Sequence, residues 1–417
     1  MSGAVNKEIT LHRLMNQRRV AYSLIKRVSG LLEPGIVFSR ALNQLFREQG
    51  KFGSRDRRLY RELVYAYLRY QPWLDPLAEK ESAFMDTLVL LASPTKETRS
   101  LYPTLPSHPP NLHEEIHRHR LIGKSDRDLR EALPEWFESA LSQALDDDNA
   151  LSLFARPPLW LRIQRGDPDS IVNSLREEGG ATKANDIRPV WGAPGALHCP
   201  ADFPVAQTKA YAEGKVEIQD VSSQLLLQLI HPKPEGHWLD ACAGAGGKSL
   251  QLAKMLGSNG HVSAYDPRRK ALEELRMRQK RARLSNIATL ESPPTTQRFD
   301  GALVDAPCSG SGTWRRHPYL MRQIRESDIP ERAKVQAEIL TGYAANVVSG
   351  GTLAYCTCSL FRSENEEIVE RFLQAHPQFD YAPLATDFGF SDSGRGITIL
   401  PASYDGDGLF IATFKRK

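Results

Sequence analysis

The chain of 417 residues has little cysteine, no long apolar run and a small net charge, and each absence excludes a class of protein. Its five cysteines form no CxxC pair, which argues against a disulfide framework or a structural zinc site and indicates free thiols in a reducing cytoplasm. No segment resembles a membrane span or a secretory signal. We therefore expect a cytoplasmic protein with no metal and no membrane partner, and we expect a monomer.

The positive charge is unevenly distributed, although the net charge is only +4. Residues 1–70 contain fourteen Lys and Arg against five Asp and Glu. Such a segment suits a polyanion, because phosphate contacts supply most of the non-specific affinity for nucleic acid. A solvated helical face is the alternative interpretation.

Three segments with different patterns follow one another along the chain. Residues 1–145 carry apolar side chains at helical spacing, with a proline-rich break near residues 94–110. Residues 146–215 combine a strand-like run at 159–163 with a helical run at 169–178, which predicts a small α+β subdomain. From 216 to 417, strand-like and helical runs alternate, which is typical of a parallel sheet with crossover helices. We predict an α/β fold with domains at 1–145, 146–215 and 216–417.

A glycine-rich turn from Ala243 to Lys248 follows the strand predicted at residues 238–242. Glycines at a strand-to-helix turn let the backbone approach a ligand and leave free amides at the start of the helix. Asp266 follows a second predicted strand, where an acid can bind ribose hydroxyls. The spacing matches neither the GxGxxG dinucleotide pattern nor a P-loop, so the pattern favours an adenosine-containing methyl donor. A plain tight turn is the alternative if the glycines are considered alone.

Two cysteines stand at the ends of predicted strands. Cys308 belongs to an Asp-Ala-Pro-Cys-Ser-Gly motif that begins at Asp305, and Cys358 to a Tyr-Cys-Thr-Cys-Ser motif. Ligands bind at the carboxyl ends of strands in open α/β sheets, so we expect a shared pocket. Because a thiolate is a strong nucleophile, the pair indicates covalent catalysis. Cys356 would face the same side as Cys358 on a continuing strand, so spacing alone leaves either as the nucleophile.

These motifs resemble those of the RsmB/RsmF (NOP/Sun) RNA cytosine-5 methyltransferases, and the RsmB-like branch most of all. The resemblance covers roughly residues 216–417, and its ordered motifs are Gln219–Gln224, Gly246-Gly247-Lys248, Asp305–Ser309, Arg316-His317-Pro318, Thr357-Cys358-Ser359 with Glu364-Asn365, and Tyr404–Phe410. It implies a Rossmann-like class I methyltransferase domain with a mostly parallel, seven-stranded sheet. The amino-terminal part is similar in pattern to the helical NusB-like domain of RsmB, followed by the small α+β insert.

The resemblance also implies a reaction and the residues that perform it. The reaction is transfer of a methyl group from S-adenosylmethionine to C5 of a cytosine in RNA, namely 16S ribosomal RNA. C5 is a poor nucleophile, so a thiolate first adds to C6, and the resemblance and the position at the strand end assign this step to Cys358. Asp305, oriented with Lys248, is implied as the acid at N3, and Cys308 as the residue needed for release. The implied cofactor-binding residues are Cys242, Ala243, Gly244, Ala245, Gly246, Gly247, Lys248, Asp266 and Asp305.

Two departures from the family pattern change what is expected of the cofactor site. The turn has Gly244-Ala245 where the family has Ala-Pro, so it should be more flexible while keeping its amides. The family's Gly-Asp after the third strand is replaced by the segment at 290–294, which leaves no acid assigned to the adenine side.

Alternative functions stay open at this point. They are a catalytically silent RNA-binding or ribosome-assembly factor, a tRNA cytosine-5 methyltransferase, and DNA cytosine methylation through the cysteine of the Pro-Cys motif. The basic segment at 268–283 is interpreted as either a solvated face or a phosphate contact. We interpret Cys199 and Cys356 as small buried hydrophobic residues, and His113, His117 and His119 as surface residues of a proline-rich segment.

Overall fold

The computed structural model describes residues 2–33, 35–50, 52–105, 120–121, 125–126, 129–178, 187–385 and 388–417. The chain forms two compact units. The first contains residues 1–138, 146–156 and 314–325, and the second contains residues 139–145, 157–313 and 326–417. His113, His117 and His119 lie outside the described residues.

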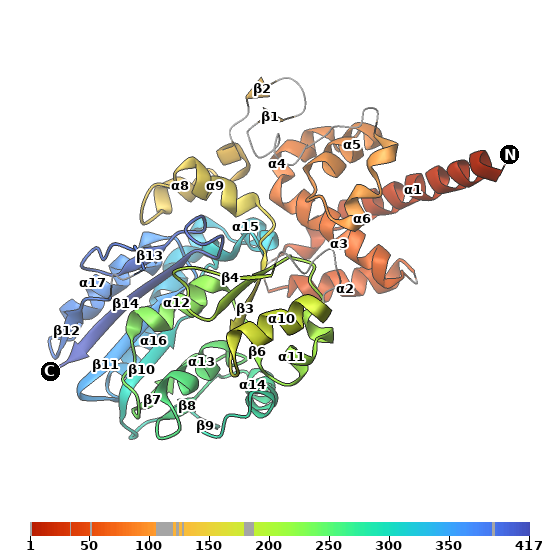
Figure 1. The fold of residues 1–417 in the computed structure, drawn as a ribbon. Helices are drawn as coiled ribbons and strands as arrows, with labels where there is room; N and C mark the ends of the chain where they lie inside the picture. Colours follow the sequence, from red (N-terminus) through yellow and green to blue (C-terminus); the bar gives the residue numbers. More distant parts are fainter. Residues whose placement is uncertain are drawn as a thin grey trace. The chain divides into compact units, whose positions relative to one another are not determined.

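The first unit is helical, apart from a two-stranded ribbon (Figure 1). Its core is formed by apolar residues at helical spacing, such as Leu24, Phe38, Leu63 and Leu88, all of which are buried. The elements of this unit are α1 (Ser2–Lys26), α2 (Phe38–Glu48), α3 (Ser54–Arg69), α4 (Gln71–Leu74), α5 (Glu81–Leu91), α6 (Lys96–Arg99), α9 (Asp147–Phe154), α15 (Pro318–Gln323), β1 (Arg120–Leu121) and β2 (Ser125–Asp126). The short helix α8 (Phe137–Ala140) lies where the chain passes from this unit to the second.

Residues 314–325 belong to the first unit although they follow the Cys308 motif in sequence. Arg322 on α15 donates hydrogen bonds to the carbonyl oxygens of Leu68 (2.8 Å) and Arg69 (2.9 Å). The ring of Tyr319 stacks on Phe38 with centroids 4.7 Å apart. The Arg-His-Pro motif at 316–318 therefore belongs to the helical unit.

The second unit is built around an eight-stranded sheet with five parallel central strands (Figure 1). The order is β12-β14-β11-β10-β7-β8-β9, with β13 paired to β14, and the three strands at the β14 end run antiparallel to their neighbours. The strands are β7 (His237–Asp240), β8 (His261–Ala264), β9 (Ile287–Thr289), β10 (Phe299–Asp305), β11 (Val347–Thr357), β12 (Phe379–Ala382), β13 (Ile397–Ile399) and β14 (Leu409–Arg416). The strand order reverses between β7 and β10, which is the switch point where α/β sheets bind ligands. The predicted α/β fold is confirmed, and β13 adds a short strand to the seven that were expected.

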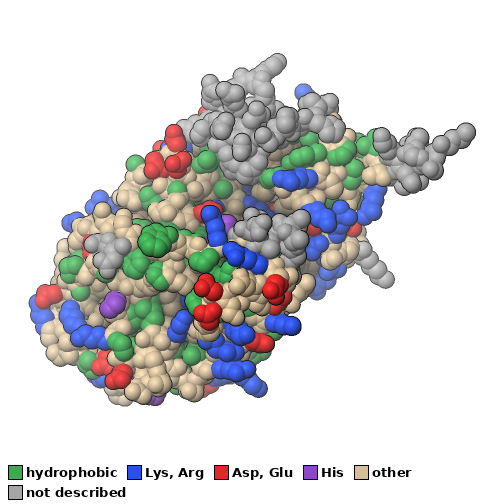
Figure 2. Space-filling model, viewed as in Figure 1, with side chains coloured by type: hydrophobic (Ala, Val, Ile, Leu, Met, Phe, Trp, Pro, Cys, Tyr) green, Lys and Arg blue, Asp and Glu red, His purple; other side chains and the backbone are tan. Residues whose placement is uncertain are grey.

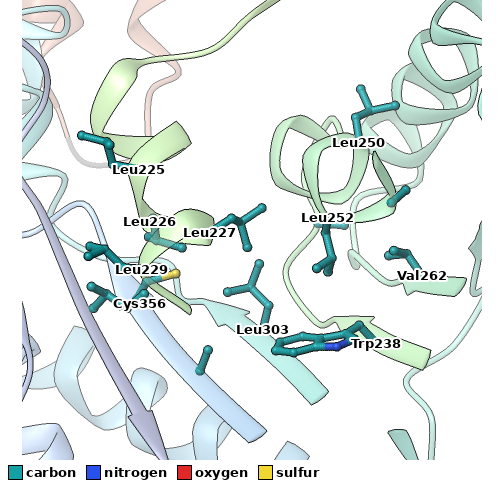
Figure 3. Close-up of a cluster of buried hydrophobic side chains, with 14 of the residues drawn as sticks. Leu225, Leu226, Leu227, Leu229, Trp238, Leu250, Leu252, Val262, Leu303 and Cys356 are labelled. Carbon is teal, nitrogen blue, oxygen red and sulfur yellow. The ribbon is translucent and has the colours of Figure 1, made fainter. Parts of the chain in front are cut away.

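Helices cover both faces of this sheet because neighbouring strand residues point to opposite sides. Trp238, Leu303 and Cys356 face α12 (Val221–Ile230), α13 (Gly247–Leu256) and α14 (Arg269–Ala282), as Figure 3 shows for much of this cluster. Leu239 and Tyr355, each adjacent in sequence to one of these, belong to the core formed with α16 (Ile329–Ala344) and α17 (Glu366–Ala375). Burial on both faces explains why the buried positions of the central strands are mostly apolar.

A smaller antiparallel sheet precedes the large one in the chain. Its strands lie in the order β4 (Arg188–Pro189), β5 (Ala196–Cys199), β3 (Leu159–Ile163) and β6 (Val216–Ile218). With α10 (Pro168–Glu178) and α11 (Lys209–Ala212) it encloses a separate apolar core that contains Cys199. The strand expected at 159–163 and the helix expected at 169–178 are confirmed.

Candidate active site

The four predicted catalytic residues come from three elements that meet at the carboxyl edge of the large sheet. Lys248 is the second residue of α13, Asp305 ends β10, and Cys358 directly follows β11. The ammonium group of Lys248 donates a hydrogen bond to Oδ2 of Asp305 at 2.7 Å. Although burial acts in the opposite direction, the carboxylate of Asp305 raises the pKa of Lys248, so this lysine keeps its ammonium charge.

The two candidate cysteines are in direct contact. Their Sγ atoms lie 3.2 Å apart, and both residues are partly exposed. The carbonyl oxygen of Cys358 accepts a hydrogen bond from the amide of Gly312 (3.0 Å), which links the two cysteine loops. The hydrogen bond with Cys358, together with burial, raises the pKa of Cys308 well above its ordinary value. Two thiols in contact at a strand edge can divide nucleophilic attack and proton transfer between them.

Cys356 faces the same side of the sheet as Cys358 but is completely buried. Its Sγ atom lies 3.6 Å from Oδ1 of Asp305, and Figure 3 shows it among the leucines of the core. Burial and the nearby charge of Asp305 raise its pKa well above the ordinary value. Of Cys356 and Cys358, only Cys358 has the exposure that attack on a substrate needs.

A cavity of about 720 Å³ lies beside Lys248 and Asp305, at the switch point of the sheet. All the predicted cofactor-binding residues except Gly246 line it. Sequence reasoning did not include the other lining residues, which are Ser223, Asp240, Ala241, Tyr265, Pro267, Arg268, Pro307, Ile339 and Tyr343. Cys308 and Cys358 do not line the cavity, so the thiols lie outside the space available to a cofactor.

Asp266 is buried and already accepts several hydrogen bonds. Oδ2 accepts from the amide of Gly244 at 2.9 Å, and both carboxylate oxygens accept from the guanidinium of Arg268. Although burial raises it, these bonds lower the pKa of Asp266, so the carboxylate is ionised at neutral pH. The side chain of Arg268 is 72% exposed, so it can move aside when a ribose hydroxyl approaches this acid.

Asp240 ends β7, lines the cavity and carries a buried carboxylate oxygen. Oδ2 accepts a hydrogen bond from Ser249 (2.6 Å), whereas Oδ1 finds no hydrogen-bond partner among the described residues. Burial raises the pKa of Asp240 to about 6. The sequence signal that would have pointed to Asp240 is its position at the end of the strand, shortly before the glycine-rich turn. An unsatisfied carboxylate oxygen at a cavity wall suits a cationic ligand.

Gly246 does not line the cavity, and it lies close to Leu275 on α14. Its φ is +85°, and a Cβ at this position would lie 2.5 Å from Cγ of Leu275 on α14. We expect Gly246→Ala to lower the free energy of unfolding by about 2 to 4 kcal/mol, from overpacking and left-handed backbone strain. Urea denaturation would measure this effect.

The adjacent Gly247 provides a matched control for that substitution. An added Cβ there meets nothing within 4 Å, and the residue begins α13. Gly247→Ala should change the stability by less than about 1 kcal/mol, because Ala favours a helix over Gly. Equal losses in the two variants would contradict the packing role of Gly246.

The basic segment after Asp266 is partly a structural element. Arg278 and Arg281 on α14 form ion pairs with the buried carboxylate of Glu217, at 3.0 and 2.7 Å. Other basic side chains of α14, such as Lys270 and Lys280, are exposed. Figure 2 shows Lys and Arg side chains over the region where α14 lies in Figure 1. Arg278 and Arg281 are therefore held by Glu217, while the other basic residues of the 268–283 segment stay open to either interpretation, a solvated face or a phosphate contact.

Three further findings bear on ligands and partners. Glu291, the acid nearest the end of β9, pairs with Arg276 at 2.9 Å and does not line the cavity. Within the described ranges, no group of three or more His, Cys, Asp or Glu side chains is arranged to hold a metal ion. In the same ranges, no helix combines the length and the apolar character needed to cross a membrane.

The parallel sheet, the glycine turn after its first strand and the acid after the next strand together define a class I methyltransferase fold. Solved structures support this fold. PH0851 matches with a TM-score of 0.72 over 96% of this chain and 98% of its own, at 22% identity. The structure of NSun6 from Pyrococcus horikoshii with SFG matches with a TM-score of 0.59 over 69% of this chain and 99% of its own, at 16% identity.

Comparison of sequences identifies the family within that class. The profile described as 16S rRNA methyltransferase RsmB/F matches residues 227–415. The "Probable ribosomal RNA small subunit methyltransferase B" of Synechocystis sp. is 33% identical over 303 residues, which is 68% of this chain and 67% of the relative. The Escherichia coli protein named ribosomal RNA small subunit methyltransferase B is 33% identical over 305 residues, covering 70% and 68%. This chain belongs to the RsmB/F methyltransferase family.

Proposed function

We propose that this chain transfers a methyl group from S-adenosylmethionine to C5 of a cytosine in RNA, and that the RNA is 16S ribosomal RNA. The observation that supports this most is the pair of partly exposed thiols, Cys308 and Cys358, in contact at 3.2 Å beside the carboxyl edge of the sheet. The names of the relatives support the choice of RNA. The proposal includes a monomer that acts in the cytoplasm, with domains at 1–145, 146–215 and 216–417.

The residues of the cavity fit this methyl donor. Its ribose hydroxyls would bind Asp266, its polar groups would meet the amides of the glycine turn, and its ammonium group would satisfy Oδ1 of Asp240. A volume of about 720 Å³ is in the range of small-molecule sites. When bound, the donor supplies an electrophilic methyl group on a sulfonium ion.

The protein side chains prepare the cytosine for this methyl group. The thiolate of Cys358 adds to C6, and the Asp305 carboxylate relays to N3 a proton from the ammonium group of Lys248, which donates a hydrogen bond to it. C5 becomes an enamine carbon and accepts the methyl group. Loss of the C5 proton to water then expels the Cys358 thiolate, and return of the N3 proton to the Asp305–Lys248 pair restores the neutral aromatic ring. Cys308 is the residue required for this release.

The reaction needs an unpaired or extruded base, because C5 and C6 of a stacked and paired cytosine are not open to a thiol on the enzyme. The amino-terminal segment, with fourteen basic residues against five acidic ones, supports RNA binding through phosphates. This binding should weaken steeply as the salt concentration rises.

Replacement of Cys308 by Ala tests the proposal. Attack by Cys358 and methyl transfer should still occur, but release should fail, so the variant should accumulate a covalent protein–RNA adduct. We expect turnover to fall by roughly 10²-fold or more. A denaturing gel with labelled RNA and the methyl donor would reveal the adduct as a slower band.

The double variant Cys308→Ala, Cys358→Ala is the matched control, because it lacks the nucleophile and should form no adduct. A catalytically silent RNA-binding factor would give no adduct with either protein. Competing RNA and DNA substrates in the same assay would identify a DNA methyltransferase, and competing 16S rRNA and tRNA would identify a tRNA enzyme.

A further inference from the structure

Glu364 is a buried carboxylate that contacts the residue after each candidate cysteine. It ends a short 3-10 turn (Arg362–Glu364) and has no exposed surface. Oε1 accepts a hydrogen bond from the amide of Ser309 at 2.8 Å, and Oε2 accepts from the hydroxyl of Ser359 at 2.5 Å. One anion therefore connects the loop after β10 to the turn after β11.

Two other residues fix this carboxylate in place. Gln336 on α16 donates through Nε2 to Oε1 of Glu364 (2.8 Å) and to the carbonyl oxygen of Pro307 (3.0 Å). The hydroxyl of Tyr355 donates to the carbonyl oxygen of Glu364 at 2.5 Å. Because Pro307 precedes Cys308 and Ser309 follows it, the network holds the backbone of this cysteine on both sides.

The three groups that donate to the carboxylate of Glu364 are neutral. Neutral donors do not cancel the charge of a carboxylate, which can therefore act on neighbouring groups through the buried interior. The hydrogen bond with Cys358, burial and the charge on Glu364 all raise the pKa of Cys308. These effects favour the thiol form of Cys308, whose Sγ lies 3.2 Å from the sulfur of Cys358, within hydrogen-bond distance.

We propose that Glu364 is the positioning residue that separates the roles of the two cysteines. By binding the residues that follow both of them, its carboxylate holds Cys308 as the hydrogen-bond donor to the Cys358 sulfur, so that Cys358 attacks the pyrimidine and Cys308 does not. The catalytic part of this assignment rests on the proposed function. The difference in reactivity between the two thiols does not, and it can be measured without RNA.

Alkylation of the full-length protein by iodoacetamide tests this assignment. Both thiols are partly exposed, so mass spectrometry of the two peptides reports the rate at each sulfur as a function of pH. In the wild type, Cys358 should react at least about tenfold faster than Cys308 near pH 8. Equal rates, or faster reaction at Cys308, would overturn the proposal without any variant.

Glu364→Gln removes the charge while keeping the size of the side chain. The midpoint of the pH profile for Cys308 should then fall by about one unit, because the anion that opposes a thiolate there is gone. Ser359→Ala is the matched control, because it deletes one donor and keeps the charge, and it should leave the Cys308 midpoint in place. If Glu364 were merely structural, Glu364→Gln would leave the alkylation midpoints of Cys308 and Cys358 unchanged. Alternatively, Glu364→Gln and Ser359→Ala would shift the midpoints of both cysteines by the same amount.

This readout needs neither RNA nor methyl donor, so it is independent of the proposed function. A wild type that fails to methylate RNA but shows the expected alkylation profiles would overturn the methylation proposal alone. Normal methylation together with an unchanged Cys308 profile in Glu364→Gln would overturn the role of Glu364 alone.

Discussion

Replacing Cys358 with Ala should abolish methyl transfer, with a loss on the order of 10⁴- to 10⁶-fold, as for removal of other enzyme nucleophiles. Without the sulfur, C6 is not attacked and C5 does not become nucleophilic. Binding of S-adenosylmethionine should persist, because Cys358 does not line the cavity. Transfer of a labelled methyl group to RNA measures the first effect, and calorimetric titration with the donor measures the second.

Cys356→Ala is the sharpest control for this prediction. Cys356 lies two residues before Cys358, near the end of β11 and on the same face, but it is completely buried. We expect it to retain activity within about tenfold and to lose about 1 kcal/mol of stability from the small cavity. An inactive Cys356→Ala together with an active Cys358→Ala would show that the nucleophile had been assigned to the wrong cysteine.

The local elements around the site could be predicted from the sequence because short-range patterns determine them. The glycine turn and the helix to Leu256 are confirmed, since Gly246 and Gly257 bound an apolar helix. The parallel strands that end at Asp240 and Asp305 follow from continuous apolar runs, which need burial on both faces.

The remainder depends on contacts between distant parts of the chain. Ile339 and Tyr343 reach the cavity from α16, and no local motif marks them. The inward orientation of Arg278 and Arg281 depends on Glu217, which is more than sixty residues away. Likewise, no pattern in the sequence indicates that α15 packs on α3 of the helical unit.

Asp305→Asn should lower methyl transfer by about 10²- to 10⁴-fold, because the acid at N3 is lost while the shape is preserved. Lys248 would also lose its anionic partner, leaving a mostly buried ammonium group with a side chain only 14% exposed. We expect the variant to lose about 1 to 3 kcal/mol of stability at neutral pH. Labelled methyl transfer and urea denaturation are the two measurements.

The pH dependence of stability gives this prediction a distinctive sign. In the wild type, Asp305 raises the pKa of Lys248, so that stabilisation is present below the unfolded pKa and is lost only as the pH rises through the folded value. In Asp305→Asn, burial alone lowers this pKa, so part of the lost stability should return as the pH rises towards 10, near the ordinary lysine value of about 10.4.

Asp300→Asn on the same strand is the control, because this exposed carboxylate lies at the opposite end of β10, where it accepts the amide of His237 (2.8 Å). It should keep methyl transfer within about twofold, as surface substitutions usually do. If Asp305→Asn kept its activity too, the proton at N3 would have to come from another group. If the free energy of unfolding of Asp305→Asn fell with rising pH as it does in the wild type, the charge on Lys248 would not depend on Asp305.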